Sequence, residues 1–476
     1  MTEPPQDSTE HRFLHSTVAA YGSQLIRLVV SFAARVALAR LLLPTDHGLY
    51  ELALRIVTIA AAVRDLGLPY HLMRDPRRPY GTVLAFTLIS GAVVTGVLVL
   101  AAPLASLLNG DLPGVLRVYA VWVLLDGLMV VPRTFFDREL RIRRLLVPEV
   151  LRGLITAAIS VTLAVFGWGV WSFIYADLAA AAGFAAMVWV RARGQVPLKL
   201  ELSLVPELVK KSAYLFFIWV AFQLVTYIDV YIIEAFRSTD AVGYYSRAYM
   251  IAFLMSLIVA PRALVPALVE YRQDAQRFLG AFRMGTVFLL SFQVLAAYFL
   301  FLNAEKVVAI LLGDQWGPSV TLLKILCFVP LLDVFTDLGG EVLKVRHEDR
   351  TWLLLVLLNL VSLLGFGILF TSRWGAQGMA CANFLLFGHL VMAWRMATIF
   401  GPGFRKVLGD LAQVYLIPIP FFLVAAQLGP SGSWTRFLAS AAAGALALAL
   451  LGHRFYRPFR SFFGPGRRAS VPGQAS

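Results

Sequence analysis

Long apolar stretches alternate with short polar loops along almost the whole chain. A helix that crosses a bilayer needs about 20 apolar residues, because the hydrocarbon core is about 30 Å thick and a helix rises about 1.5 Å per residue. The pattern therefore predicts about fourteen transmembrane helices and an all-α polytopic membrane protein. Their approximate limits are residues 16–43, 48–72, 82–108, 115–133, 148–166, 168–191, 212–236, 243–267, 282–303, 319–340, 351–371, 375–399, 409–428 and 434–453.

The first apolar stretch carries polar side chains on one face. They recur at steps of seven and four residues, which places them in a single stripe along a helix. The stripe consists of Ser16, Ser23, Arg27, Ser31 and Arg35. An arginine near the middle of a membrane costs about 2.5–3.5 kcal/mol, so it is tolerated mainly beside a wet cavity, a partner or an anionic ligand. The first helix is therefore predicted to form one wall of a cationic pathway.

Composition and charge agree with this interpretation. Hydrophobic residues make up 59% of the chain and charged residues only 15%, whereas soluble domains carry about 25% charge. The formal net charge is +14, but the Lys and Arg residues lie mostly in loops after even-numbered spans, with about 26 there and about six in the other loops. This asymmetry predicts that both termini are cytoplasmic, and it explains the positive charge without nucleic-acid binding.

The chain also repeats itself. Residues 107–114 resemble residues 311–318, where Asp111 and Gly114 match Asp314 and Gly317 at an offset of 203. Residues 140–143 resemble residues 343–346 at the same offset. Elsewhere the offset drifts, so that Gly48-Leu49-Tyr50 pairs with Gly243-Tyr244-Tyr245 at an offset of 195. An even number of spans separates the copies, so both enter the membrane in the same orientation. This predicts a parallel repeat related by an axis along the membrane normal, as in alternating-access transporters.

The repeat predicts the domain organisation. Two parallel six-helix lobes surround a central cavity, and two helices follow them. The predicted parts are an N-terminal lobe over residues 1–190, a basic cytoplasmic linker over 191–211, a C-terminal lobe over 212–400, two further helices over 401–455 and a basic cytoplasmic tail over 456–476.

Further arginines lie inside or at the ends of predicted spans. Arg55 is four residues after Glu51 in the second span, which favours either an ion pair within one helix or a binding role. Arg247 and Arg262 lie near opposite ends of the eighth span, where each either extends to the interface or contacts a ligand.

Carboxylates also lie inside the predicted spans. Buried carboxylates near the middle of a membrane often bind a coupling proton or sodium ion, and they also serve as partners of buried arginines. Both alternatives stay open for each of them. The candidates for ion coupling are Asp126, Asp177, Asp229 and Asp333.

Several kinds of chemistry lack their motifs. There is no Walker A motif, no HExxH, no cluster of His and Cys, and no Gly-x-Ser-x-Gly. His389 lies inside a span, where a structural role is expected. The sequence therefore predicts neither an ATP-driven motor nor an enzyme, and neither a metal nor a cofactor.

Several segments carry a family resemblance. They are Leu38 to Tyr50 (LARLLLPTDHGLY), Asp65 to Leu68 (DLGL), Val242 to Ala248 (VGYYSRA), Leu312 to Trp316 (LGDQW) and Trp374 to Gly378 (WGAQG). In order and spacing they resemble Wzx-type polysaccharide-unit flippases of the multidrug/oligosaccharidyl-lipid/polysaccharide exporter superfamily. The most similar subgroup comprises the exporters of lipid-linked exopolysaccharide and of O-antigen units of lipopolysaccharide.

The resemblance implies a V-shaped pair of lobes around a cationic cavity. The implied substrate is an undecaprenyl-diphosphate-linked oligosaccharide, which moves from the cytoplasmic to the periplasmic leaflet of the bacterial inner membrane. The implied partners are membrane lipids, a polysaccharide polymerase and its chain-length machinery. Many family members have twelve spans, so the last two helices here either form a groove for the lipid tail or simply pack.

The resemblance also implies roles for the arginines. Arg27 and Arg55 are the implied diphosphate ligands, together with Arg247 or Arg262. Arg35 either contacts the substrate at a later stage or pairs with a neighbouring carboxylate. Two alternatives remain open for the whole chain, namely a cation-coupled multidrug exporter and a membrane-embedded glycan polymerase or ligase, although the short outer loops argue against the latter.

Overall fold

The computed structural model describes residues 29–463, apart from residues 140, 142, 255 and 257–264. All regular elements of this described part are helices. The chain divides into two compact units. Among the described residues, unit 1 comprises those up to Ser246 together with 311–313, and unit 2 comprises the rest.

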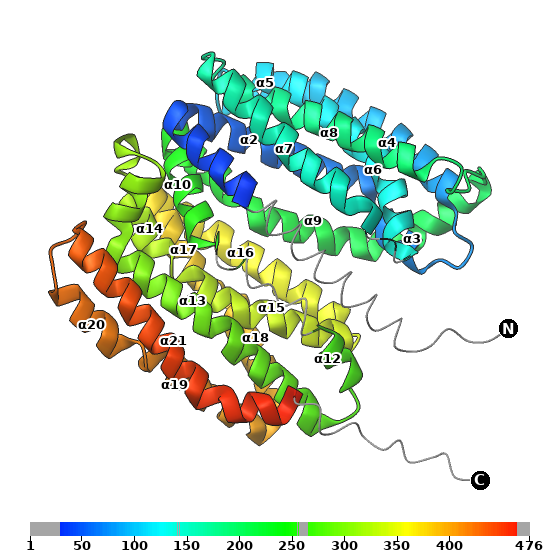
Figure 1. Cartoon of the computed structure of the whole chain (residues 1–476). Coiled ribbons are helices and arrows are strands. Elements are labelled where there is room, and N and C mark those ends of the chain that lie inside the picture. Colours follow the sequence, from blue (N-terminus) through cyan, green and yellow to red (C-terminus); the bar gives the residue numbers. More distant parts are fainter. Residues whose placement is uncertain (1–28, 140, 142, 255, 257–264, 464–476) are drawn as a thin grey trace, which may run out of the picture. The chain divides into compact units, whose positions relative to one another are not determined.

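Unit 1 is a bundle of long helices, drawn from blue to green in Figure 1. Residues 29–41 form its first described helix. The others are α2 (Pro44–Asp65), α3 (Leu68–Arg74), α4 (Tyr80–Ala101), η1 (Ala102–Leu107), α5 (Leu112–Tyr119), α6 (Val121–Arg138), α7 (Arg143–Val165), α8 (Trp171–Ala192), η2 (Leu202–Leu204), α9 (Val205–Phe236) and the first part of α10 (Thr239–Ala252). The most extensive packing joins α7 to α8, α4 and α8 to α6, and α2 to α9.

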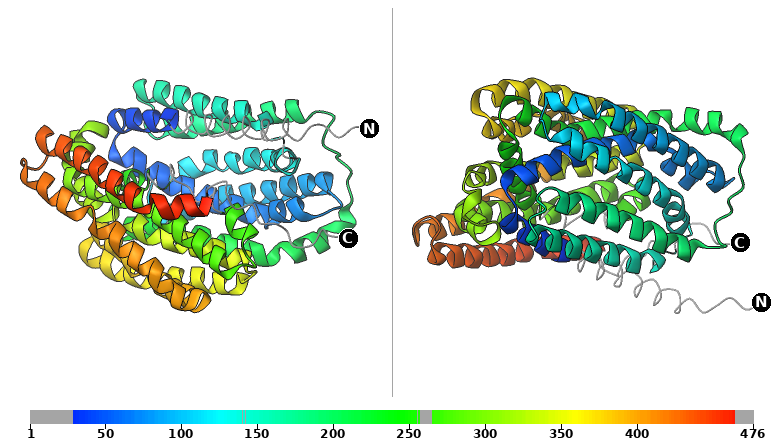
Figure 2. Two further views of the ribbon diagram at one scale, coloured as in Figure 1. Left: turned by 60° about the horizontal axis from the view of Figure 1, so that its bottom comes forward. Right: turned by 90° about the horizontal axis from the view of Figure 1, so that it is seen from above.

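Unit 2 is a second helical bundle. Its elements are α12 (Val265–Glu270), α13 (Ala275–Leu311), η4 (Asp314–Trp316), α14 (Ser319–Leu326), α15 (Val329–Val345), α16 (Asp349–Trp374), α17 (Ala376–Ala382), η5 (Asn383–Leu385), α18 (Phe387–Phe400), η6 (Gly401–Gly403), α19 (Phe404–Leu416), α20 (Ile419–Gln427) and α21 (Trp434–Phe463). Here α16 packs on α17, and α15 packs on α18. The last two helices, α20 and α21, lie side by side, in orange and red in Figure 2.

Many helices bury one side and expose a second apolar side. On α4, for example, Ile89, Val93, Val97 and Leu100 are all more than half exposed. A water-soluble helix would carry polar residues on that side, so this surface suits contact with lipid tails. Together with the hydrophobic length of the helices, it confirms the prediction of an all-α multi-pass membrane protein.

The number of spans is less regular than the hydropathy suggests. The described residues contain nine helical segments long and apolar enough to cross a membrane, or ten if the bent pair α14–α15 forms one span. One continuous segment, Ala376–Gln427, covers the predicted spans 375–399 and 409–428. Much of the predicted first span lies outside the described residues, so the number fourteen stays a prediction.

The predicted second span, residues 48–72, is divided into α2 and α3. Asp46 holds the start of α2, because its carboxylate accepts the backbone N–H groups of Leu43 and Val170, each at 3.1 Å. The helix ends where Leu66 and Gly67 adopt φ values of 45° and 73°. In unit 1, α2 and α3 both pack against α9. The predicted boundaries of the lobes stay a prediction.

Candidate functional site

The predicted arginines differ in what the structure describes. Arg27 and Arg262 lie outside the described residues. Arg35 is exposed on the helix of residues 29–41 in unit 1. Arg247 is buried in unit 2, with a guanidinium nitrogen 3.7 Å from the sulfur of Met250.

Arg55 is the centre of a charged cluster inside unit 1. Its guanidinium lies 3.4 Å from a carboxylate oxygen of Glu51 and 3.9 Å from one of Asp229. It also donates to the Thr226 carbonyl at 3.3 Å and lies 4.9 Å from the centre of the Tyr227 ring. Of the predicted residues, the structure thus brings Arg55 and Asp229 together. The ion pair within α2, which the spacing of Glu51 and Arg55 favoured, is present.

The Arg55 cluster is a buried site with mixed charge. Arg55 is 9% exposed and Asp229 is 4% exposed. The Asp229 carboxylate also accepts the N–H of Val230 at 2.8 Å. Two carboxylates and aromatic contact hold the guanidinium in place, and it is the group in this cluster that suits an oxyanion, because its planar donors match phosphate oxygens in pairs.

Arg64, which the analysis of the sequence did not single out, is completely buried near the end of α2. It forms ion pairs with Asp65 at 2.7 Å and with Asp126 at 2.9 Å, and it donates to the Val123 carbonyl. Asp126 therefore has an arginine partner in the structure. The partners lie far apart in the sequence, so spacing alone contains no signal for this pair.

Asp177 on α8 is held by two tyrosines. The hydroxyls of Tyr50 and Tyr119 both donate to the same carboxylate oxygen, at 2.8 and 2.6 Å. The Tyr50 ring stacks on Phe173 with the ring centres 4.4 Å apart. Neither tyrosine was predicted as a site residue, because an aromatic residue in an apolar helix usually serves packing.

Asp333 lies in unit 2, on α15. A carboxylate oxygen lies 3.9 Å from Nε2 of His389 on α18. The other ring nitrogen, Nδ1, lies 2.6 Å from the hydroxyl oxygen of Thr336. The structure therefore brings a predicted ion-coupling carboxylate together with the histidine for which only a structural role was expected.

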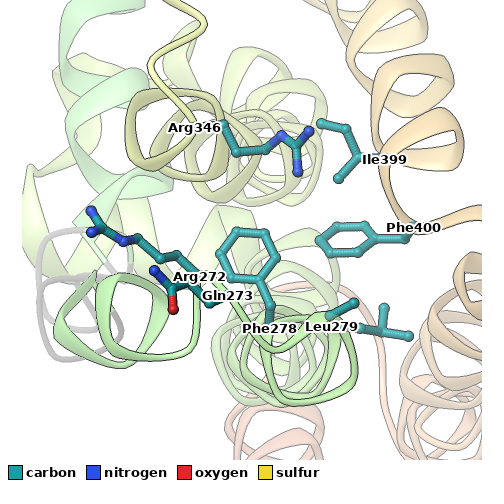
Figure 3. A pocket seen from close by; sticks show the side chains of 8 residues that line it. Arg272, Gln273, Phe278, Leu279, Arg346, Ile399 and Phe400 are labelled. Carbon is teal, nitrogen blue, oxygen red and sulfur yellow. The ribbon is translucent and has the colours of Figure 1, made fainter.

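Unit 2 also contains a small pocket, shown in Figure 3. Its apolar part is formed by Phe278, Leu279, Ile399 and Phe400, and Arg346 extends over it. Its volume of about 140 Å³ is roughly ten times the minimum for one water molecule. The pocket therefore suits a few waters or a small group, and it is too small for a lipid-linked oligosaccharide. It includes none of the predicted site residues.

Long apolar helices, breaks within spans and buried ion pairs are typical of membrane transporters. The structure aligns with a solved structure of the lipid II flippase MurJ in an inward closed conformation, with a TM-score of 0.74. The alignment covers 93% of this chain and 99% of that chain, at 13% sequence identity. At this identity the similarity establishes the fold alone.

The sequence comparison identifies the family. A family described as "Polysaccharide biosynthesis protein" matches residues 37–321, which is more than half of the chain, and the chain belongs to this family.

Two curated relatives have names that agree with this family. The chain is 25% identical over 195 residues to the teichuronic acid biosynthesis protein TuaB of Bacillus subtilis (strain 168), covering 38% of this chain and 39% of that protein. It is 23% identical over 296 residues to the succinoglycan biosynthesis transport protein ExoT of Rhizobium meliloti (strain 1021), covering 60% of each. The chain thus matches less than two thirds of the length of either relative.

Proposed function

We propose that this protein is a flippase for undecaprenyl-diphosphate-linked oligosaccharides in surface polysaccharide biosynthesis. It would move them from the cytoplasmic to the periplasmic leaflet of the bacterial inner membrane by alternating access. The family and the fold support the general class. The proposed substrate rests mainly on one observation, the buried guanidinium of Arg55, which is suited to a diphosphate.

The mechanism needs no covalent chemistry. In the structure, Glu51 and Asp229 hold the Arg55 guanidinium. A diphosphate would compete with these carboxylates, and its higher charge would draw the guanidinium to the substrate. The proposed ligands are Arg55 and Arg27, with Arg35, Arg247 and Arg262 as further candidates along the path. No nucleophile or general base takes part, so the protein is proposed to be a transporter and not an enzyme.

The decisive experiment measures translocation by the purified full-length protein in proteoliposomes. The probe is undecaprenyl-diphosphate carrying a fluorescent oligosaccharide, whose exposure on the outer leaflet is followed with a membrane-impermeant quencher. Arg55→Gln is expected to reduce the rate at least tenfold. The matched control is Arg117→Gln, because Arg117 is exposed on α5. If Arg55→Gln translocates the probe at the wild-type rate, Arg55 does not bind the substrate. If the wild-type protein does not move the probe, the proposed flippase function is wrong.

One observation favours an alternative function. The Arg55 cluster contains two carboxylates, Glu51 and Asp229, for one arginine, and such an excess suits an organic cation. A site rich in carboxylates is what we would expect in a cation-coupled multidrug exporter. Efflux of ethidium from cells that lack their own exporters would support it if Asp229→Asn abolished the efflux.

The proposal also includes a topology. Both termini are proposed to be cytoplasmic, because the basic loops follow even-numbered spans. Single cysteines introduced near each terminus should react with a membrane-impermeant maleimide only after the cells are permeabilised. Labelling of intact cells at either position would contradict this orientation.

A further inference from the structure

Two neighbouring spans of unit 2 are interrupted within their length. The helices α14 and α15 meet at a bend of 41°. The helices α17 and α18 are joined by η5 and by Leu386, whose ψ of 108° is extended. Interrupted helices in transporters often mark the place where a substrate or coupling ion binds, because they direct polar groups into the membrane interior.

The interruption before α18 is held by specific hydrogen bonds. The N–H of Gly388 donates to the Asn359 side-chain oxygen at 2.8 Å, and the N–H of Phe387 donates to the Ser362 hydroxyl oxygen at 3.3 Å. Both acceptors lie on α16. Free N–H groups at the start of a buried helix need such partners. The start of α18 is therefore fixed where it places His389 in the first turn.

The two interrupted spans bring one carboxylate and one imidazole together. Asp333 lies in the second turn of α15, His389 lies on α18, and these two helices pack against each other. The distance of 3.9 Å from Nε2 to the carboxylate oxygen exceeds the usual range of about 2.7–3.2 Å for a hydrogen bond. The His389 side chain is 11% exposed and the Asp333 side chain 32% exposed, so the pair is accessible mainly from the Asp333 side.

Thr336 contacts the second nitrogen of the His389 ring. Its hydroxyl oxygen lies 2.6 Å from Nδ1 of His389 and 3.4 Å from the Leu332 carbonyl oxygen. We assign the hydroxyl as donor to Leu332 and as acceptor of the Nδ1–H, because this arrangement uses both contacts. With this assignment, the neutral imidazole presents an unprotonated Nε2 to Asp333. Two acceptors then face each other, and a single proton between them satisfies both.

We propose that Asp333 and His389 form a binding site for one proton, which couples unit 2 to the proton gradient. This deepens the proposed transport function and rests on it for its biological role. The proton enters on Nε2 or on the Asp333 carboxylate and forms a bridge, which shortens the separation by about 1 Å to a normal hydrogen bond. Binding therefore pulls α18 toward α15. Sodium fits this site less well, because hard cations prefer ligand sets made of oxygen.

Besides the pair, a second carboxylate lies close by on α15, and several other charged groups nearby have partners of their own. Asp337 lies one turn further along α15 and is the nearest further carboxylate on that helix. Between residues 351 and 372, α16 carries no charged residue. Other charged groups on the described elements that pack against α15 and α18 lie on several helices. On α12, α14 and α15 they are Glu270, Lys324, Glu341 and Lys344, of which the last two pair with each other. On α16 they are Asp349, Arg350 and Arg373, and on α18 Arg395, which pairs with Glu348. On α13 they are Arg277, Arg283, Glu305 and Lys306, and on α19 Arg405, Lys406 and Asp410; Arg283 pairs with Asp410, and Glu305 pairs with Lys324.

The first test needs no transport. The full-length protein, labelled with ¹⁵N-histidine and held in nanodiscs, is titrated by NMR, and the signal that disappears in His389→Gln belongs to His389. In Asp333→Asn, the His389 titration midpoint is expected to shift to lower pH, because the carboxylate no longer stabilises the imidazolium. Glu341→Gln, on the same helix, is the matched control and leaves the midpoint unchanged. An unchanged midpoint in Asp333→Asn would overturn the proton site.

Thr336→Val is the second variant for the NMR titration, and it replaces Asp333→Asn as the test if Asp333→Asn does not fold. It retains both titrating groups but removes the acceptor for Nδ1, so the His389 midpoint is again expected to move. Asp337→Asn tests the neighbouring carboxylate. A larger shift of the His389 midpoint in Asp337→Asn than in Asp333→Asn would contradict the pairing of His389 with Asp333.

The second test uses transport and separates the two proposals. In proteoliposomes, translocation of the fluorescent lipid-linked oligosaccharide is expected to accelerate severalfold under an imposed proton gradient. Asp333→Asn and His389→Gln should lose this acceleration, and Glu341→Gln should keep it. If the wild-type protein moves no substrate but the His389 midpoint still depends on Asp333, the proposed flippase function is wrong and the proposed proton site is retained. If the variants keep the acceleration, coupling through this site is wrong.

Discussion

Gly48 and Gly243 occupy matching places in a close contact between α2 and α10 within unit 1. A Cβ atom on Gly48 would lie 2.0 Å from the carbonyl oxygen of Thr239, and a Cβ atom on Gly243 would lie 2.1 Å from the carbonyl oxygen of Pro44. Both Gly48 with Gly243 and Pro44 with Thr239 are 195 residues apart. The same contact is therefore made twice, once from each copy of the repeat.

This double contact predicts that both glycines are needed for stability. Alanine at either position forces two helix backbones apart, because the nearest atom is a carbonyl oxygen that cannot move independently of its helix. Gly48→Ala and Gly243→Ala should each destabilise the protein by about 1–3 kcal/mol, as overpacking of a core does. The measurement is unfolding of the purified protein in detergent, followed by intrinsic fluorescence.

Gly96 on α4 is the matched control, because a Cβ atom there would have no atom within 4 Å. Gly96→Ala should stabilise the helix by up to about 1 kcal/mol, since alanine is the better helix former. Equal effects at Gly96 and Gly48 would show that the α2–α10 contact is not close in the folded protein.

The ion pairs of Arg64 predict a different kind of loss. Arg64 is fully buried and paired with Asp65 and Asp126. Arg64→Met should cost up to about 3–5 kcal/mol, because it leaves two partly buried carboxylates without their fully buried partner. Asp126→Leu in the same chain should recover part of that loss. Arg117→Gln, at an exposed position, should have almost no effect in the same unfolding measurement. If Arg64 and Asp126 pair directly, the double variant should lose less stability than the sum of the losses of the two single variants.

Asp177 provides a third prediction, which concerns hydrogen bonds and not ion pairs. The carboxylate accepts the hydroxyls of Tyr50 and Tyr119. Tyr119→Phe should destabilise the protein by about 1.5–3 kcal/mol, the usual contribution of a hydrogen bond to a charged group. Tyr175→Phe is the control on α8, because that ring is 39% exposed. If both variants unfold alike, the hydrogen bonds to Asp177 do not stabilise the fold.

The sequence alone predicts those structural features that depend on a local pattern of residues. The helical fold follows from long apolar runs, and the pair of Glu51 and Arg55 follows from their spacing of four residues. An ion pair between two different helices produces no such regular spacing in the sequence. Arg64 meets Asp126 only because α2 packs against α6.

The interruption before α18 is also hidden in the sequence, because the apolar composition continues through it. Its hydrogen bonds come from α16, 25 and 29 residues earlier in the chain, which no helical spacing can reveal. The contact between His389 and Asp333 depends on that interruption. Arg27 and Arg262 lie outside the described residues, so their proposed roles rest on the sequence.

The last prediction concerns pH and lies outside the membrane-spanning segments. Glu207, in the first turn of α9, accepts two hydrogen bonds from Arg77, at 2.9 and 3.1 Å, and one from Lys211 at 2.6 Å. These bonds, with Arg77 the largest contributor, lower the pKa of Glu207 from 4.5 to about 2. A group with a lowered pKa contributes stability above its ordinary pKa and loses that contribution as the pH falls through the lowered value.

The contact between α9 and the loop after α3 should therefore be intact at neutral pH and weaken progressively as the pH falls from about 4.5 toward about 2. Glu207→Gln should lower the melting temperature slightly at pH 7, and the difference from wild type should shrink as the pH falls through this window. Because both partners are largely exposed, 0.5 M salt should also reduce the difference. Glu270→Gln, at an exposed position on α12, is the control. A difference between Glu207→Gln and wild type that stays constant down to pH 2 would show that the pair with Arg77 does not form.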